Sequence, residues 1–212
     1  MQPNFADRDG LIWFDGELKP WRDCTTHVLT HTLHYGLGCF EGVRAYQTVE
    51  GAAIFRLHDH TRRLFDSAKI LGMNIPFSME EIDAAQKAAV ASNDLEHAYL
   101  RPMVVYGSEG MGLRADLLKP HVIVAAWAWG SYMGEENLKR GIKVRTSSYM
   151  RHHVNITMTK AKANGNYMNS MLALQEALTG GADEALLLDP EGYVAEGSGE
   201  NFFIVRDGVI YT

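Results

Sequence analysis

Two apolar segments, 99–106 and 122–129, constrain the fold most strongly because both are rich in β-branched and aromatic residues. Such runs are typical of strands buried in a sheet. An Asp15-Gly16 pair inside segment 11–18 adds the strongest short-range signal for a β-hairpin. We therefore expect the first part of the chain to be organised around a sheet.

Two helices are predicted among these strands. The first covers segment 58–72, with Asp59 as its N-terminal cap and Gly72 at its end. The second runs from Ser78 to about Ala91 and carries acidic residues in its first turn. Further short strands are expected at 43–46 and 53–57.

The polar, glycine-containing segment that follows Trp129 suggests a domain boundary. We predict a small N-terminal α/β domain at 1–128, an interdomain loop at 129–135, and the first part of a larger domain at 136–212. The second part should contain a strand at 142–146 and an amphipathic helix at 165–178, whose apolar stripe is expected to lie in the core. It should end in an antiparallel meander of short strands at 184–188, 193–196, 202–205 and 209–211. The fold class is therefore α+β, a mixed α/β arrangement.

Charge and composition narrow the possible partners. The net charge is −6 and no long Lys/Arg run is present, which argues against nucleic acid or an anionic membrane as a partner. No apolar stretch approaches the roughly 20 residues of a membrane span, and the first residues have no secretory character. The 2 cysteines lack Cys-x-x-Cys spacing, which excludes a disulfide scaffold or a four-cysteine zinc site. We expect a cytoplasmic protein that binds small molecules.

Two polar clusters carry the most chemical information: segment 162–167 (KANGNY) and segment 196–201 (EGSGEN). Lys162 opens a turn before a predicted helix and can point its amine into a cleft, and Glu196 can point a carboxylate into the same cleft. Pyridoxal phosphate (PLP) requires a lysine for its aldehyde and an acid that keeps its ring nitrogen protonated. From the residues alone, a solvated surface lysine and an exposed turn glutamate remain the alternatives.

Arginines supply candidate cations for a phosphate and for substrate carboxylates, since guanidinium groups bind both anions bidentately. Arg101 stands out because it lies in the middle of a predicted strand, where a charge needs a partner or a cavity. The other candidates, which are more typical of a solvated surface, are Arg44, Arg56, Arg62 and Arg63.

Several other patterns do not support a catalytic site. His27, His31 and His34 are close in sequence but lack an HExxH motif, so packing and capping roles are favoured over metal binding. The glycines of segment 36–42 do not have the spacing of a dinucleotide-binding fingerprint. Ser198 lacks the Gly-x-Ser-x-Gly motif of a serine hydrolase.

Taken together, these residues and their surroundings resemble the branched-chain amino acid aminotransferases, which are fold-type IV (class IV) PLP enzymes. The resemblance spans nearly the whole chain. It implies a two-domain fold-type IV architecture, with a small N-terminal α/β domain and a larger β-rich domain that is incomplete here. The matching segments are 12–16, 34–36, 40–44, 63–64, 66–69, 99–102, 110–112, 129–132, 162–167 and 196–201.

The resemblance also implies roles for individual residues. Lys162 would form the Schiff base with PLP, Glu196 would pair with the ring nitrogen, Tyr167 would contact the phenolic oxygen, and Arg63 would hold the phosphate. The residues that it implies for substrate binding are Tyr35, Phe40, Arg44, Tyr99, Arg101, Leu113, Trp129 and Tyr132.

Within this set, Tyr99 and Arg101 match positions used for substrate carboxylates, and Arg101 is suited to the distal carboxylate of glutamate. The residues that match the apolar pocket for an aliphatic side chain are Tyr35, Phe40, Trp129 and Tyr132. The resemblance implies that Tyr35 and Leu113 are lent by a second subunit. We therefore expect a homodimer or homohexamer with the active site near the subunit interface.

The implied reaction is transamination of leucine, isoleucine and valine with 2-oxoglutarate, as in branched-chain amino acid biosynthesis. A D-amino acid aminotransferase and an aminodeoxychorismate lyase of the same fold remain alternatives. Family chains continue beyond the segment that matches 210–212, so the resemblance implies a C-terminally truncated form. PLP binding by this form is expected to be weak or absent, which makes a non-catalytic, cofactor-free fragment the third alternative.

Overall fold

The computed structural model describes residues 4–130 and 135–212, and the chain divides into two compact units. Unit 1 comprises Met1–Gly130 and Lys160–Gly165, and unit 2 comprises Ser131–Thr159 and Asn166–Thr212. The return of Lys160–Gly165 to unit 1 was not expected from the sequence, since this segment follows the loop predicted at 129–135. It means that Lys162 belongs to the first unit.

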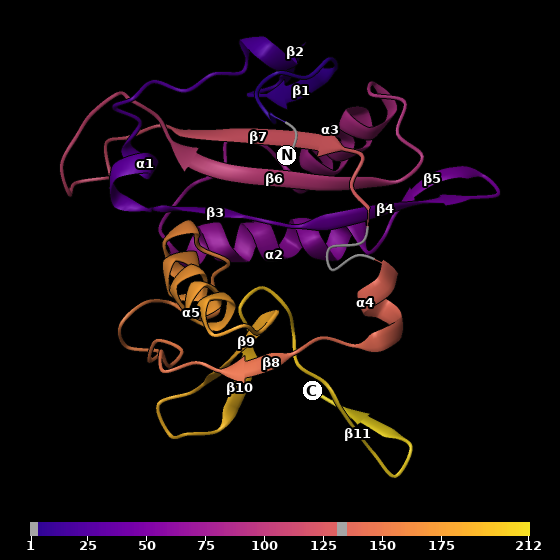
Figure 1. Cartoon of the computed structure of the whole chain (residues 1–212). Helices are drawn as coiled ribbons and strands as arrows, with labels where there is room; N and C mark the ends of the chain where they lie inside the picture. Colours follow the sequence, from indigo (N-terminus) through magenta and orange to yellow (C-terminus); the bar gives the residue numbers. More distant parts are fainter. Residues whose placement is uncertain (1–3, 131–134) are drawn as a thin grey trace. The chain divides into compact units, whose positions relative to one another are not determined.

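Unit 1 is built on a seven-stranded antiparallel sheet (Figure 1). The strands are ordered β2-β1-β7-β6-β4-β5, and β3 also pairs with β6. Their bounds are β1 Leu11–Phe14, β2 Glu17–Pro20, β3 Gly38–Phe40, β4 Val43–Thr48, β5 Gly51–Ile54, β6 Ala98–Tyr106 and β7 Pro120–Trp127. A short 3₁₀ helix, η1, follows β2 at Trp21–Asp23.

The hairpin predicted around Asp15-Gly16 is confirmed. Strands β1 and β2 pair in register from Leu11 opposite Pro20 to Phe14 opposite Glu17. Both turn residues have positive φ, 48° at Asp15 and 100° at Gly16. Asp and Gly tolerate this conformation better than most residues, which explains why this pair forms the turn.

The helices of unit 1 are α1 His31–Tyr35, α2 Leu57–Ile70 and α3 Met79–Ala91. Helix α3 begins as predicted: the Ser78 hydroxyl accepts from the backbone N–H of Glu81, and the Glu81 carboxylate accepts from that of Ser78. This reciprocal capping satisfies the backbone N–H groups of Ser78 and Glu81, which have no acceptor within the helix itself.

The start of α2 corrects two predictions. The strand expected at 53–57 is wrong in its second half, because β5 ends at Ile54 and Leu57 already belongs to α2. Asp59 is not the N-terminal cap; Arg56, with φ of 52°, takes that position. Asp59 lies in the first turn and pairs with Arg56 and Arg62. A negative charge at this position interacts favourably with the helix dipole.

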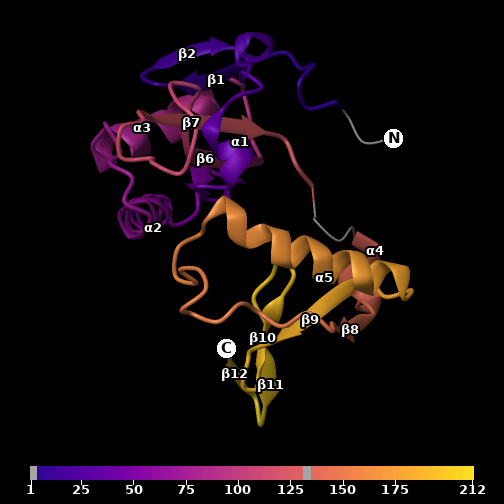
Figure 2. The same ribbon diagram turned by 90° about the vertical axis from the view of Figure 1, so that its left-hand side faces the viewer.

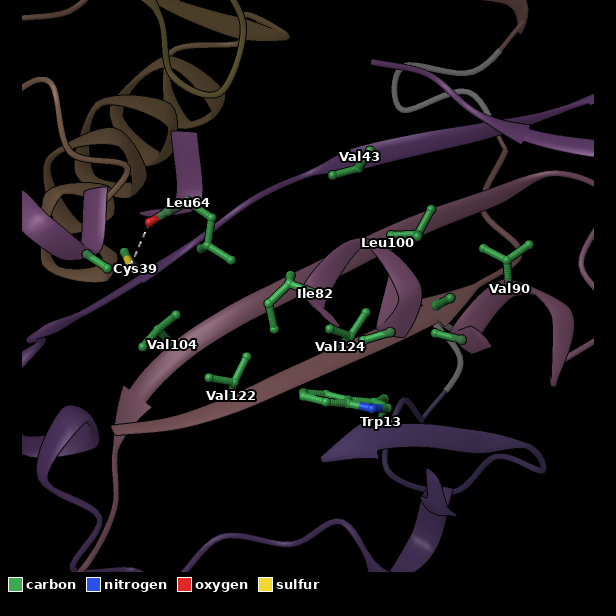
Figure 3. Close-up of a cluster of buried hydrophobic side chains, with 14 of the residues drawn as sticks. Trp13, Cys39, Val43, Leu64, Ile82, Val90, Leu100, Val104, Val122 and Val124 are labelled. Atoms are coloured by element: carbon green, nitrogen blue, oxygen red, sulfur yellow. Dashed lines mark hydrogen bonds between the residues drawn. The ribbon is translucent and has the colours of Figure 1, made fainter. Parts of the chain in front are cut away.

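The core of unit 1 lies between the sheet and the helices α2 and α3. Figure 3 shows Leu64 of α2 and Ile82 of α3 in one cluster with buried side chains of the strands. Strand β6 alternates along its length, so that Leu100 and Val104 are fully buried on the core side. The residues at the alternate positions of β6, among them Tyr99 and Arg101, therefore lie on the opposite face of the sheet.

The described residues of unit 2 form two small sheets and two α-helices. Strand β8 (Val144–Thr146) pairs in parallel with β9 (Glu184–Leu188), which pairs antiparallel with β10 (Val194–Gly197). Strands β11 (Ile204–Arg206) and β12 (Val209–Tyr211) form a separate hairpin. The predicted single antiparallel meander is therefore wrong, although its strands are present. The helices are α4 Glu135–Arg140 and α5 Tyr167–Thr179, the latter preceded by the 3₁₀ helix η2 at Asn164–Asn166.

Helix α5 has the predicted period but buries a different face. Figure 2 shows α5 alongside β9, and the side chains it buries are small: Ser170, Ala173 and Ala177. Met168 and Met171 of the predicted apolar stripe are each 70% exposed. The prediction that this stripe lies in the core is wrong for this structure, because small side chains allow a closer approach of helix and strand.

Among 4–130 and 135–212, none of the helices combines the length and the apolar character needed to cross a membrane.

Candidate active site

The backbone of Lys162 is fixed between a strand and a helix of unit 1. Its N–H donates to the Ser67 hydroxyl of α2 over 3.0 Å, and its carbonyl accepts from the N–H of Phe40 over 3.1 Å. An antiparallel bridge between Cys39 and Ala163 extends the contact with β3. Lys162 is therefore held by tertiary hydrogen bonds and is only half exposed.

The amine of Lys162 lies beside Phe40. Its Nζ is 5.5 Å from the centroid of the Phe40 ring, and the guanidinium carbon of Arg101 is 4.4 Å from the same centroid. Contacts of this kind between a cation and an aromatic face are attractive. One aromatic ring thus brings together the predicted catalytic lysine and the predicted carboxylate-binding arginine.

Aromatic residues extend this surface along the sheet. The ring of Tyr99 lies 4.8 Å from that of Trp129, and its hydroxyl accepts from Nη2 of Arg101 over 2.8 Å. Arg44 donates from Nη1 to the carbonyl of Gly130 over 3.3 Å. The guanidinium of Arg101, in the middle of β6, therefore has partners in Tyr99 and Phe40, as the sequence predicted. Tyr132, also predicted for this pocket, lies outside the described residues.

Arg63 lies on α2 one turn before Ser67, and it is held by a glutamate that sequence reasoning missed. Glu41 accepts from Arg63 Nε over 2.5 Å and from Nη2 over 2.7 Å, and His60 Nδ1 lies 2.9 Å from the same carboxylate. Burial raises the pKa of Glu41, but the hydrogen bonds from Arg63 and His60 outweigh it and leave the pKa lowered. A carboxylate between Phe40 and Gly42 in an otherwise uncharged run was the available signal.

His31 contacts both Tyr35 and the loop that carries Leu113. The rings of His31 and Tyr35 are 4.6 Å apart, and His31 Nε2 lies 2.8 Å from the carbonyl of Gly112. Tyr35 is 43% and Leu113 89% exposed. Both side chains are thus available at the surface of unit 1.

The loop that carries Leu113 is also tied down at His121. Its Nδ1 lies 2.6 Å from the Asp15 carboxylate and its Nε2 lies 2.6 Å from that of Glu109. Burial alone lowers the pKa of His121, but hydrogen bonds with the two carboxylates outweigh it and raise the pKa above its usual 6.5. The stabilisation is therefore fully present below about pH 6.5, the unfolded value, and is lost as pH rises through the raised value.

We expect His121→Gln to destabilise unit 1 by about 1–2 kcal/mol near pH 5.5, because a charged hydrogen-bonded group is lost. The difference from the unchanged protein should shrink toward pH 9. Urea unfolding at a series of pH values measures it. His27→Gln is the matched control, since the exposed ring of His27 accepts a backbone N–H of Leu29. A difference that stays constant across this range contradicts the prediction.

In unit 2, Glu196 is paired with an arginine that the sequence did not single out. Arg151 Nε lies 2.5 Å from Glu196 Oε1. Its Nη1 donates to Asn169 over 2.9 Å and to Ser170 over 3.2 Å, both on α5. A charge-assisted bond of this length fixes the orientation of the carboxylate. Tyr167, the first residue of α5, is half-buried.

The turn that follows Glu196 is supported by the buried carboxylate of Glu184 and by the half-buried Glu200. Glu184 accepts from the N–H of Ser198 over 3.1 Å, and the carbonyl of Glu200 accepts from that of Gly197 over 2.9 Å. Burial, and then the hydrogen bond with Glu184, raise the pKa of Glu200 to about 7. Order in the 196–201 turn therefore depends on Glu184 and Glu200 as well as on its glycines.

Some histidines in the described residues contact backbone carbonyls, whereas His60 and His121 pair with carboxylates. His31 Nε2 contacts a backbone carbonyl, and so does His34 Nε2, which lies 2.9 Å from Val28 O. Within 4–130 and 135–212, no group of three or more His, Cys, Asp and Glu side chains is placed to hold a metal ion.

Each unit carries groups whose chemistry suits pyridoxal phosphate. Unit 1 supplies an anchored amine at Lys162 and an oriented guanidinium at Arg63, which suit an aldehyde and a phosphate. Unit 2 supplies an arginine-paired carboxylate at Glu196, which suits a pyridinium N–H.

Comparison with known proteins relates the chain to one family. The family model described as "Amino-transferase class IV" matches residues 38–212. The branched-chain-amino-acid aminotransferase of Pseudomonas aeruginosa is 73% identical over 99% of this chain and 68% of its own length. That of Escherichia coli K12 is 43% identical over 95% of this chain and 65% of its own length. The chain thus spans about two thirds of the length of these relatives.

Solved structures agree with this relationship. A branched-chain amino acid aminotransferase from T.th. with pyridoxamine 5'-phosphate has a TM-score of 0.91 and 51% identity, covering 96% of this chain and 67% of that one. Its complex with N-(5'-phosphopyridoxyl)-L-glutamate has a TM-score of 0.89 and 49% identity, covering 96% and 66%. Its complex with 4-methylvaleric acid has a TM-score of 0.88 and 49% identity, also covering 96% and 66%.

Proposed function

The chain belongs to the class IV aminotransferases, with branched-chain-amino-acid aminotransferases among its near relatives, and on that premise we propose that it transfers amino groups between branched-chain L-amino acids and 2-oxoglutarate. Class IV aminotransferases use pyridoxal phosphate. When bound, this cofactor withdraws electrons from the substrate α-carbon so that its proton can leave.

Lys162 is the residue proposed to hold the cofactor and then to move the proton at the substrate α-carbon. A lysine in this role has to be positioned by its surroundings, because proton transfer requires hydrogen-bond reach. The two backbone hydrogen bonds to Ser67 and Phe40 supply that positioning. Lys160, two residues earlier, is exposed.

Three other residues are proposed to bind the cofactor. Arg63 holds the phosphate, since its guanidinium is charged at all relevant pH values. Glu196 accepts from the ring N–H, supported by its pairing with Arg151. Tyr167 donates to the phenolic oxygen.

The arrangement of Arg101 over the Phe40 ring carries the proposal for the substrates. An aromatic surface accepts an aliphatic side chain, and a guanidinium on that surface accepts the distal carboxylate of glutamate when the second substrate binds. Phe40, Trp129 and Tyr132 are proposed to form the apolar surface, and Arg44 to act at its edge. Tyr99, whose hydroxyl is bonded by Arg101, is proposed to act with Arg101 on the substrate carboxylates. The glutamate and 4-methylvaleric acid complexes of the T.th. enzyme support this choice of ligands.

Assembly and location complete the proposal. Tyr35 and Leu113, both exposed on unit 1, are proposed to enter the active site of a second copy in a homodimer or homohexamer. The active site then lies near the subunit interface. Cys24 and Cys39 are both free, which favours a reducing compartment such as the cytoplasm.

A substrate panel tests the proposal on the protein expressed from its complete gene. With 2-oxoglutarate as acceptor, we expect turnover of L-leucine, L-isoleucine and L-valine and no turnover of D-alanine. Aminodeoxychorismate should not be cleaved. Turnover of D-alanine or aminodeoxychorismate without turnover of L-leucine would replace the proposed activity with one of the two alternatives of the same fold.

A further inference from the structure

We infer that Glu41 is a positioning residue for phosphate recognition, which it serves by fixing the guanidinium of Arg63, with His60 supporting it. The inference rests on the proposed function in one respect, namely that Arg63 binds the cofactor phosphate. It adds two residues that touch neither cofactor nor substrate. Their contribution should appear as selectivity for the phosphorylated form of the cofactor.

The first observation is the burial of Glu41. Its side chain is 0% exposed, whereas that of Arg63 is 53% exposed. A buried carboxylate is costly unless it is paired and hydrogen-bonded. Glu41 meets this condition through Arg63 and His60, and its backbone N–H donates to Pro102 in β6 over 2.9 Å. The Glu41 carboxylate is thus held in one position by its hydrogen bonds, and the Arg63 side chain extends from it toward the surface.

The second observation is how Glu41 bonds the guanidinium. It accepts from Nε and from Nη2, one bond on each carboxylate oxygen. A planar guanidinium has five N–H donors, and a bidentate pair of this kind fixes its plane as well as its position. Glu41 uses one edge of the group.

The third observation is that α2 carries both anchors. Arg63 and Ser67 lie one helical turn apart, and Ser67 accepts from the backbone N–H of Lys162. Residues four apart share a helix face. Helix α2 therefore fixes the spacing between the lysine that holds the aldehyde end of the cofactor and the arginine that holds its phosphate end. Glu41 keeps this spacing constant, because an arginine side chain without such a bond samples many rotamers.

Glu41 has two opposing effects on phosphate binding: its negative charge disfavours binding, and its orientation of Arg63 favours it. The Glu41 carboxylate is negative and by itself repels a phosphate. The carboxylate is paired with the Arg63 guanidinium over 2.5 Å, so a phosphate meets this pair and not an unpaired carboxylate. Loss of the orientation of Arg63 has no such compensation. We therefore expect removal of the Glu41 charge to weaken phosphate binding.

The test compares the binding of pyridoxal 5'-phosphate and of pyridoxal to the protein expressed from its complete gene. Glu41→Gln has nearly the same shape but cannot accept two bonds from Arg63. It should weaken binding of the phosphorylated compound about tenfold and leave that of pyridoxal within about twofold. A merely structural role lowers the thermal stability of the protein without changing this ratio.

A double-mutant cycle removes the remaining ambiguity. Arg63→Lys alone should lower the preference for the phosphorylated compound, and Glu41→Gln should have no further effect on the ratio in that background. If Glu41→Gln does not fold, His60→Ala provides the second variant, with an expected loss of about threefold. An undiminished or increased preference in Glu41→Gln or His60→Ala overturns the inference and leaves the proposed function intact. Absence of any preference in the unchanged protein overturns both.

Discussion

Replacing Lys162 with alanine is expected to lower the rate of transamination by at least about 10³-fold. The variant loses the amine that is proposed to hold the cofactor and to act as the base at the substrate α-carbon. The backbone N–H and carbonyl that bond Ser67 and Phe40 are retained. The fold of unit 1 should therefore be unaffected.

The rate is measured with L-leucine and 2-oxoglutarate under saturating conditions. Lys160→Ala is the matched control, because it removes an exposed lysine from the same segment and should retain nearly full activity. Substantial activity in Lys162→Ala, or loss of activity in Lys160→Ala alone, contradicts the assignment of Lys162.

Replacing Leu64 with alanine is expected to destabilise unit 1 by about 2–5 kcal/mol. Leu64 is fully buried between α2 and the sheet (Figure 3), so its truncation leaves a cavity in close-packed surroundings. The same helix carries Arg63 and Ser67. Loss of this packing should therefore make the positions of Arg63 and Ser67 less well defined, in addition to destabilising the core.

Urea unfolding followed by tryptophan fluorescence measures this effect. Trp13, Trp21, Trp127 and Trp129 all belong to unit 1, so the signal reports on that unit. Ile70→Ala on the same helix is the control, since Ile70 is 42% exposed and its truncation should cost less than that of the fully buried Leu64. Equal losses in the two variants would mean that Leu64 does not anchor α2.

Local patterns allowed much of the fold to be predicted. The hairpin at Asp15-Gly16, the strand β6 and the start of α3 after Ser78 depend on neighbouring residues, and the structure confirms each of them. Errors occurred where tertiary packing decides. The exposed stripe of α5 has as good a helical period as its buried face, so periodicity could not identify which one meets β9.

The candidate site divides in the same way. The charge of Arg101 within a strand was unusual enough to predict that it has partners, and Phe40 and Tyr99 are those partners. Glu41 was overlooked because its meaning depends on α2 crossing β3, a long-range contact. Arg151 lies in an irregular loop with no local signal at all. Pairwise partners of this kind follow from the assembled fold rather than from composition or spacing.

The identity of the residue that binds the cofactor tests the central claim most directly. The protein expressed from its complete gene is mixed with pyridoxal phosphate, reduced with borohydride, digested, and examined by mass spectrometry. We expect one phosphopyridoxyl group, on Lys162, and none on the Lys162→Ala variant. A group on Lys160 or on another lysine, or no covalent group after reduction, would contradict the account.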